Sequence, residues 1–369
     1  MRIFSICTIV FLDFLGPVEM LISLQKKEYS PLQSSSIAIL SLIAISVLLI
    51  NTFIEPDRFA DYFSYIELVD RYYFFRDENW FLFEPVSTSI FLILKYFFVS
   101  TELSVNIAHF ILGIFYVGII TFISVKYSAD WRSILICFCV FGALMAFVTI
   151  RATPAYFFVT IAFMESLRNN KKAVLYVFVA ALFHMSAILA LIPLILSLLQ
   201  NKFSTLSWVY FAGRRAFFTL IGALGLIAFL RSFFQEFIYT FINSVPILSR
   251  YLVYVYSISA NSVNISTQAE EVSIFHTIYL VLCSIFVLAL ITNQSDICRR
   301  SRLYIFSSYL VFLLMQFSPV TAFRQSMFWM LPAIFVFPWT AYTVGRFGAF
   351  PLVAGALLIF LYQLSTLIV

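Results

Sequence analysis

The stretch AVLYVFVAALFHMSAILALIPLILSLL, residues 173–199, contains no aspartate, glutamate, lysine or arginine. As a single helix it would be about 40 Å long, whereas the hydrocarbon core of a bilayer is only about 30 Å thick. Basic residues precede and follow it, and basic loops favour the cytoplasmic side. The stretch therefore predicts two short passes with a turn near Phe183-His184-Met185-Ser186, below the outer membrane surface in a water-filled recess.

The composition of the whole chain agrees with a membrane environment. Of its 369 residues, 62% are hydrophobic and 11% are charged, and the mean hydropathy is +0.99. Soluble domains carry roughly 25% charged and 45–50% apolar residues. Further uncharged stretches are Ser104–Val125, Leu303–Phe323, Gln325–Gly345 and Phe347–Val369. We interpret the chain as an all-α polytopic integral membrane protein, because only a helix satisfies its own backbone in lipid over such lengths.

Hydropathy and the basic loops together predict about twelve transmembrane helices in one domain, residues 1–369. We place the spans at about 3–23, 36–54, 104–125, 133–150, 153–168, the two halves of 173–199, 216–231, 274–292, 303–318, 326–344 and 350–369. Both termini then lie outside, and the large extracytoplasmic loops fall at about 55–84 and 232–273. Segment 85–100 is short and follows Glu84-Pro85, so we interpret it as an interfacial or partly inserted helix.

Several classes of partner are disfavoured. The net charge of +5 resides in short loops between apolar spans, which is the positive-inside pattern rather than a nucleic-acid surface. The five cysteines lie mostly within or beside apolar spans and indicate no disulfide framework. Because we find no Cys/His ligand spacing, P-loop or GxGxxG motif, we expect no metal ion and no cofactor.

The remaining ionisable residues gather on the outer side under this topology. They are Asp57, Arg58 and Asp61 after the second span, Arg151 at the outer end of 133–150, His184 at the proposed turn, Arg250 in the large loop, and Arg324 between two apolar spans. Charges at such positions are costly and usually face a cavity or a partner. We therefore expect an outer site rich in arginine, with an aspartate and a histidine.

This residue set suits chemistry on a diphosphate. The planar guanidinium fork binds phosphate and keeps its charge, so Arg151, Arg250 and Arg324 are candidate diphosphate ligands. Asp61 and His184 are candidates to take the proton of an attacking hydroxyl. The pattern indicates glycosyl transfer from a lipid diphosphate, with the arginines stabilising the leaving group.

Each of these residues also has a purely structural interpretation. Arg151 and Arg324 would then be interfacial arginines whose stems lie in lipid, and Arg250 would cap a loop helix. His184 would be a neutral histidine bonded to a carbonyl within the bundle. Asp61 would be solvated, or would cap a helix that starts at Tyr62.

Three segments resemble the EpsG family of Wzy-like polysaccharide polymerases. They are Ile150-Arg-Ala-Thr-Pro-Ala-Tyr-Phe, the basic loop Arg168-Asn-Asn-Lys-Lys, and Ala181-Leu-Phe-His-Met-Ser-Ala ending at Pro193. Asp61-Tyr-Phe-Ser-Tyr65 resembles the aspartate and tyrosines that follow an early span in that family, and Arg324 its late arginine. The chain departs from the family pattern at Ala152, where a glutamine is usual, and at Phe59-Ala60, where Gly-Thr is usual.

The resemblance implies a GT-C-like helical architecture and an enzyme at the outer face of the bacterial plasma membrane. Such an enzyme transfers a growing glycan from its polyprenyl diphosphate carrier onto a lipid-linked repeat unit and needs no nucleotide sugar. Arg151 and Arg324 would hold the diphosphate, while Asp61 or His184 would act on the acceptor hydroxyl. Expected partners are the lipid-linked oligosaccharide, the bilayer, a chain-length regulator and a flippase.

Three other functions compete with this interpretation. An O-antigen ligase-like transferase uses the same donor with a different acceptor. A glycan O-acyltransferase would use His184 but has less need of arginines. A lipid-linked glycan transporter or flippase would make no bond, and transporters often show paired broken helices, whereas we find one broken segment near His184.

Overall fold

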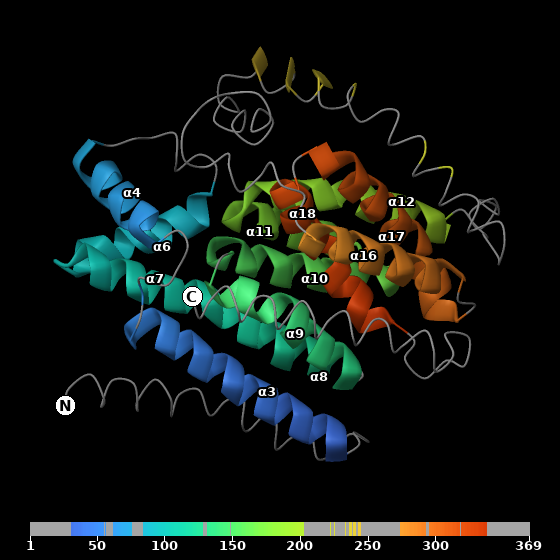
Figure 1. Ribbon diagram of the computed structural model, residues 1–369, viewed down its shortest axis with the longest axis horizontal. Coiled ribbons are helices and arrows are strands. Elements are labelled where there is room, and N and C mark those ends of the chain that lie inside the picture. The colour runs from blue at the N-terminus through green and yellow to red at the C-terminus, as the bar shows by residue number, and fades with distance from the viewer. Residues whose placement is uncertain are drawn as a thin grey trace.

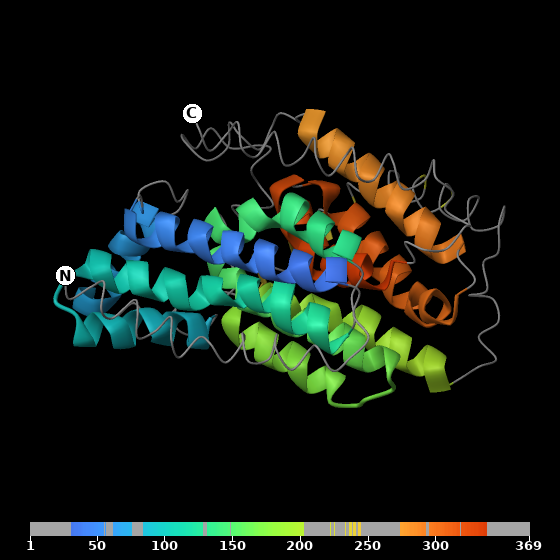
Figure 2. The same ribbon diagram turned by 90° about the horizontal axis from the view of Figure 1, so that it is seen from below.

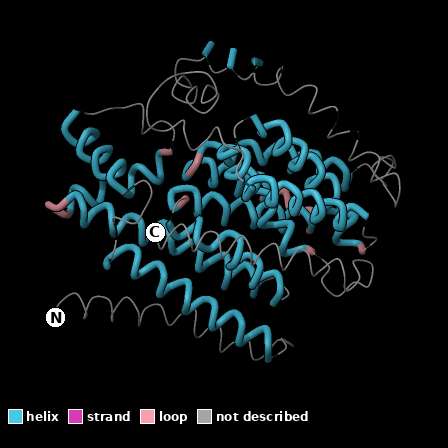
Figure 3. Tube along the Cα trace, viewed as in Figure 1, coloured by secondary structure: helices cyan, strands magenta, loops and turns pink. Residues whose placement is uncertain are grey.

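The computed structural model describes residues 31–54, 56, 62–75, 84–127, 131–147, 149–202, 274–292, 295–317 and 319–337, together with a few single positions between 222 and 244. Within these ranges every regular element is a helix and no strand occurs (Figure 3). The predicted all-α class is therefore confirmed for the described chain. Asp57, Arg58, Asp61 and Arg250 lie outside the described residues, as do the predicted spans 3–23 and 350–369 and most of 216–231.

The first part of the bundle contains α3 (Pro31–Leu49), the π-turn η2 (Ile50–Ile54), α4 (Tyr62–Phe75) and α6 (Pro85–Phe97). One long helical segment then follows, made of α7 (Thr101–Gly118), η4 (Ile119–Ile123) and α8 (Ser124–Lys126). In Figures 1 and 2, α4 and α6 lie at one end of the bundle, beside the first half of α7. The candidate site lies where the start of α6 meets the end of α11 (Ala173–Phe183).

The second part contains α9 (Trp131–Phe147), the 3-10 turn η5 (Ile150–Ala152), α10 (Thr153–Leu167), α11 (Ala173–Phe183), the 3-10 helix η6 (Met185–Ala190) and α12 (Leu191–Lys202). It continues with α16 (Ile274–Thr292), α17 (Asp296–Leu314), η9 (Met315–Phe317) and α18 (Pro319–Val336). Helix α10 is central, since it packs against α7, α11, α12, α17 and α18. Almost all of its residues are buried, so it is a fixed reference for the elements around it.

The outer surface of the bundle is apolar, the reverse of a soluble helical protein. On α11, Leu175, Phe178 and Leu182 are exposed, while the small residues Ala173 and Ala180 are buried against neighbours. Small residues at helix contacts and large apolar residues outside are the membrane pattern. On the described chain, Ile37–Ile54 and Thr101–Lys126 are long and apolar enough to cross a bilayer.

The described chain also contains shorter apolar helices, Pro85–Phe97, Ala173–Phe183, Met185–Leu199 and Ile278–Ile291. The last three coincide with predicted passes, and the first with the segment interpreted as interfacial. The predicted spans 133–150, 153–168 and 274–292 coincide with α9, α10 and α16 to within a few residues. The total of about twelve transmembrane helices, and the interfacial position of 85–100, stay predictions.

The predicted break in 173–199 is present at His184. Helix α11 ends at Phe183, His184 has an extended backbone (φ −151°, ψ 111°), and η6 follows it. Figures 1 and 2 show α11 and α12 running in opposite directions, so the chain reverses at this break. The reversal places His184 at the same end of the bundle as the start of α10.

Two boundary predictions were wrong. Arg324 lies within α18 rather than between two spans, because the helix already begins at Pro319, and proline is favoured in a first helical turn. The basic residues were predicted to lie in short loops between spans, but Arg299, Arg300 and Arg302 lie in the first two turns of α17. There the Ser295 hydroxyl caps the helix by accepting from the Cys298 amide at 3.4 Å, and Asp296 suits the positive N-terminal end.

Candidate functional site

Arg151 occupies a break between two buried helices. It lies in η5, between α9 and α10, and Pro154 stands in the first turn of α10. Proline has no backbone N–H to extend a helix from the preceding residues. The Thr153 hydroxyl donates to the carbonyl groups of Met145 and Thr149 at 3.2 and 3.1 Å, which fixes the break. The arginine side chain is therefore held at the start of α10.

Glu84 is the centre of the site. It precedes α6 as its N-cap residue, with Pro85 at the first helical position. Its Oε2 lies 3.0 Å from Nη1 of Arg151, and its Oε1 lies 2.5 Å from Nδ1 of His184. The carboxylate side chain is 6% exposed, whereas those of Arg151 and His184 are 26% and 24% exposed. One buried carboxylate thus joins two more accessible basic groups.

The break at His184 is fixed by its neighbours. The His184 amide donates to the Ala180 carbonyl at 2.9 Å, and the Ser87 hydroxyl of α6 donates to the Phe183 carbonyl at 2.9 Å. The second bond ties the end of α11 to the first turn of α6, directly after Glu84. Glu84 and His184 are therefore brought together by the backbone as well as by their side chains.

Tyr65 completes the arrangement on the other side of Arg151. The arginine Nε donates to the Tyr65 hydroxyl at 2.8 Å, and its Cζ lies 4.9 Å from the centroid of the Tyr65 ring. A guanidinium over a tyrosine face is held by the ring quadrupole. Tyr65 itself stacks on Phe91 and meets His109 edge-on, at centroid distances of 5.5 and 5.0 Å. We call Tyr65, Glu84, Arg151 and His184 the Glu84 cluster.

The cluster fixes the proton arrangement of its histidine. A carboxylate can only accept hydrogen bonds, so the Nδ1 of His184 that contacts Glu84 carries a proton. In the neutral ring the other nitrogen, Nε2, is then the basic one. An acid that orients a histidine in this way also stabilises the imidazolium that forms when Nε2 takes a proton. The pair can therefore act as a general base beside an arginine that can bind an anion.

The structure brings two of the predicted site residues together and leaves the others apart or untested. Arg151 and His184 share Glu84. Arg324 is half-buried on α18, and its backbone carbonyl accepts a hydrogen bond from the Tyr156 hydroxyl of α10 at 3.4 Å. Arg324 therefore lies on α18 beside the first turn of α10. Asp61 and Arg250 fall outside the described residues, although the helix expected to start at Tyr62 does so.

Sequence reasoning missed Glu84 as a site residue. The available signal was an acidic residue directly before a proline at the start of an apolar helix, because a charge at a membrane boundary needs a partner. Tyr65 entered only through the family resemblance. Its hydroxyl and ring face both serve Arg151, which single-residue reasoning does not reveal.

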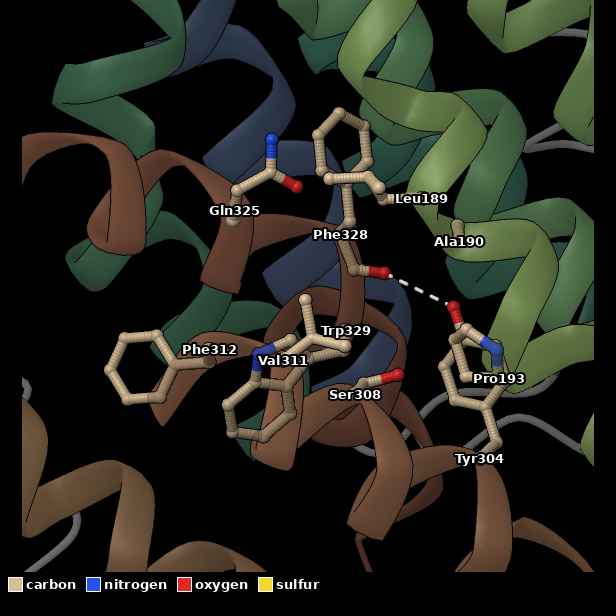
Figure 4. Close-up of a pocket in the computed structure, with 10 residues that line it drawn as sticks. All are labelled: Leu189, Ala190, Pro193, Tyr304, Ser308, Val311, Phe312, Gln325, Phe328 and Trp329. Carbon is tan, nitrogen blue, oxygen red and sulfur yellow. Dashed lines mark hydrogen bonds between the residues drawn. The ribbon is translucent and has the colours of Figure 1, made fainter. Parts of the chain in front are cut away.

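A recess lies between η6, α12, α17 and α18. Residues from η6, α12, α17 and α18 line it: Leu189, Ala190, Pro193, Tyr304, Ser308, Val311, Phe312, Gln325, Phe328 and Trp329 (Figure 4). The Tyr304 hydroxyl donates to the Phe328 carbonyl at 3.3 Å across it. Because its lining contains no charged side chain, it does not suit a diphosphate, and the Glu84 cluster is the better candidate.

In the part of the chain that the structure describes, these features define a helical bundle with an apolar outer surface and a polar site where α6, α10 and α11 meet. The model of the EpsG family matches residues 36–368, nearly the whole chain, and the chain belongs to that family. EpsG is a family of Wzy-like polysaccharide polymerases, and membership implies a membrane protein. No curated protein and no solved structure matches the chain.

Proposed function

We propose that the protein is a polyprenyl-diphosphate-dependent polysaccharide polymerase of the bacterial plasma membrane. It transfers a growing glycan from its lipid diphosphate carrier onto a lipid-linked repeat unit at the outer face. Membership of the EpsG family supports a polymerase in general terms. The Glu84 cluster supports the specific chemistry, because it combines an oriented histidine with an arginine that can bind phosphate.

The Glu84–His184 contact is the observation that carries the mechanism. An acceptor hydroxyl positioned at Nε2 of His184 attacks the anomeric carbon of the donor glycan, and its proton passes to Nε2. The new glycosidic C–O bond forms as the bond between that carbon and the diphosphate oxygen breaks. The electron pair leaves with the diphosphate, whose added charge Arg151 stabilises. Polyprenyl diphosphate is the leaving group, so the step needs no further reactant.

The remaining predicted residues take supporting roles in this proposal. Arg324 and Arg250 bind the same diphosphate, and Asp61 assists with the acceptor hydroxyl. The half-buried position of Arg324 on α18, next to α10, favours such a role for its guanidinium. An arginine that binds a diphosphate must be accessible to the substrate as it enters and leaves, and a fully buried side chain would not be.

The topology is part of the proposal. The basic residues at the far end of α10, Lys126, Arg168, Lys171 and Lys172, would face the cytoplasm under the positive-inside rule. The Glu84 cluster then faces outward, with the large loops 55–84 and 232–273 on the same side. A flippase would deliver the lipid-linked units there, and a separate regulator would set chain length.

The test is the banding of envelope glycan on a gel. We compare a strain lacking the protein with one that carries Arg151→Ala at equal membrane level. The proposal expects both to lose the ladder of repeat lengths and keep single repeat units. A normal ladder in the deletion strain would remove the polymerase assignment. Loss of only a single transfer, with chain lengths unchanged, would favour a ligase-like transferase.

A further inference from the structure

The contact between Glu84 and Arg151 has a consequence for substrate binding. Nη1 of Arg151 forms an ion pair with a buried carboxylate oxygen, and Nε donates to the hydroxyl of Tyr65. Because Nε is already engaged, a diphosphate held by two parallel N–H donors uses the end-on fork of Nη1 and Nη2, and Nη1 is the atom paired with Glu84. We propose that Glu84 and the substrate diphosphate compete for Arg151, so that Glu84 is a built-in competing anion. This inference rests on the proposed function and deepens it.

The two oxygens of Glu84 have different partners, which makes a partial exchange feasible. Oε2 faces Arg151, and Oε1 faces His184. When a diphosphate takes Arg151, the bond from Oε1 to Nδ1 of His184 remains in place. The guanidinium moves from a carboxylate to a phosphate partner, while its stacking on Tyr65 keeps it nearby. Neither the backbone nor the break at His184 has to change.

The exchange couples donor binding to the activation of the base. While Arg151 contacts Oε2, the charge of Glu84 is shared between the guanidinium and His184. Once Arg151 pairs with the diphosphate, His184 is the remaining basic partner of Glu84 in the cluster. The carboxylate then stabilises the imidazolium that forms as Nε2 takes the acceptor proton, without the guanidinium competing for it. The histidine is thus activated when the activated donor is in place, and Glu84 is a positioning residue that acts through His184.

The coupling also protects the donor. A base that is fully assisted by its carboxylate at all times would favour attack of water on the lipid-linked glycan. When Glu84 supports His184 fully only after a diphosphate has taken Arg151, proton transfer is favoured while the donor is bound. This requires the Glu84–Arg151 contact to be weaker than the contact of Arg151 with the substrate diphosphate.

Glu84→Gln separates the two functions of the carboxylate with little change of shape. The amide oxygen still accepts a hydrogen bond from Nδ1 of His184, while the amide NH₂ faces Arg151 and can no longer hold it. Binding of inorganic pyrophosphate to purified protein in nanodiscs should tighten by about tenfold, since one charge-assisted contact no longer competes. Polymerisation of lipid-linked repeat units should fall in kcat by at least tenfold, whereas KM for the donor should fall or stay unchanged.

Glu165→Gln is the matched control, because Glu165 is also a buried carboxylate that pairs with basic residues, at the other end of α10. Its pyrophosphate affinity should equal that of the wild type. Polyprenyl diphosphate is tested beside pyrophosphate, and tightening with both assigns the effect to the shared diphosphate rather than to the lipid. Unchanged or weaker pyrophosphate binding in folded Glu84→Gln would overturn the competition.

Arg151→Ala distinguishes that failure from a failure of the proposed function. If Arg151→Ala abolishes pyrophosphate binding while Glu84→Gln leaves it unchanged, Arg151 still binds the diphosphate and only the competition is wrong. If Arg151→Ala binds pyrophosphate like the wild type, the diphosphate site itself is misplaced, and the competition falls with it. Should Glu84→Gln fail to fold, Glu84→Asp provides the second variant: its shorter side chain should likewise release Arg151 and tighten pyrophosphate binding.

Discussion

The two ends of α10 each hold a buried glutamate, a tyrosine and basic side chains, but they are built differently. At one end, Glu165 receives the Tyr127 hydroxyl at 2.8 Å and the Asn170 amide at 2.7 Å, and it pairs with Lys126 at 3.1 Å. All of these partners lie on α8, on the residue that follows it, or in the loop after α10. Both carboxylate oxygens are bonded by neutral donors in addition to the cation.

At the other end, Glu84 is shared between two groups from distant parts of the chain, Arg151 and His184. The tyrosines also act in opposite ways. Tyr127 donates to the carboxylate, whereas Tyr65 accepts from the arginine. A carboxylate whose two oxygens are both held by neutral donors, as well as by cations, stabilises a loop. A carboxylate divided between an arginine and a histidine holds groups that can exchange partners, so only this end is suited to chemistry.

The largest expected difference between the two ends concerns their arginines. Arg151→Ala should reduce polymer formation by about 10²–10³-fold, because a charged donor to the leaving group is lost. Arg168→Ala should leave the glycan ladder near normal, although Arg168 lies 3.9 Å from Glu165. Gel banding of envelope glycan at equal membrane levels measures both. Equal losses in the two variants would contradict the functional distinction between the ends.

A second comparison removes one hydrogen-bond partner of each glutamate: His184 of Glu84, and Asn170 of Glu165. His184→Ala should slow turnover by about 10²-fold, since a general base is removed. Asn170→Ala, at the other end, should change turnover less than about twofold, because it removes one neutral hydrogen bond from a loop. Initial rates of polymerisation with purified lipid-linked repeat units measure both effects. A fully active His184→Ala protein would assign the base to another residue, such as Asp61.

The two tyrosines provide a smaller and more specific test. Tyr65→Phe keeps the ring under Arg151 but removes the hydroxyl that accepts from Nε. A lost hydrogen bond to a charged group corresponds to about 1.5–3 kcal/mol, but the remaining ring contact should limit the loss of activity to about tenfold. Tyr127→Phe should leave activity unchanged. If both variants behave alike, the Tyr65 hydroxyl does not position Arg151.

The smallest expected effect on activity is that of Glu165→Gln, which should stay within about twofold of the wild type. Its effect should appear in stability instead, lowering the unfolding free energy by about 1–3 kcal/mol, because a buried acceptor of charged and neutral donors loses its charge. Thermal unfolding in detergent micelles, read beside the polymerisation rate, separates the two. Loss of polymerisation in a fully folded Glu165→Gln protein would mean that both ends of α10 serve catalysis.

Much of this architecture could be predicted from local sequence. Long uncharged stretches predicted the helices, because a chain segment in lipid must satisfy its own backbone hydrogen bonds and does so as a helix. The length of residues 173–199 against a bilayer predicted the break at His184. Arg151 and His184 were candidates because ionisable groups in apolar surroundings are costly and usually face a cavity or a partner. The position of Arg324 was missed, because its apolar neighbours hid the helix start at Pro319.

By itself, then, the sequence determined the helical class of the described chain, its membrane environment and several of the polar residues that are candidates for the site. Only the tertiary structure decided which of them meet. Glu84 and His184 are separated by 100 positions, and no local pattern encodes such a pairing. It arises because α6 starts against the end of α11, where Ser87 binds the Phe183 carbonyl, and because α10 begins beside both. The buried carboxylate is stabilised by the basic groups that this packing provides.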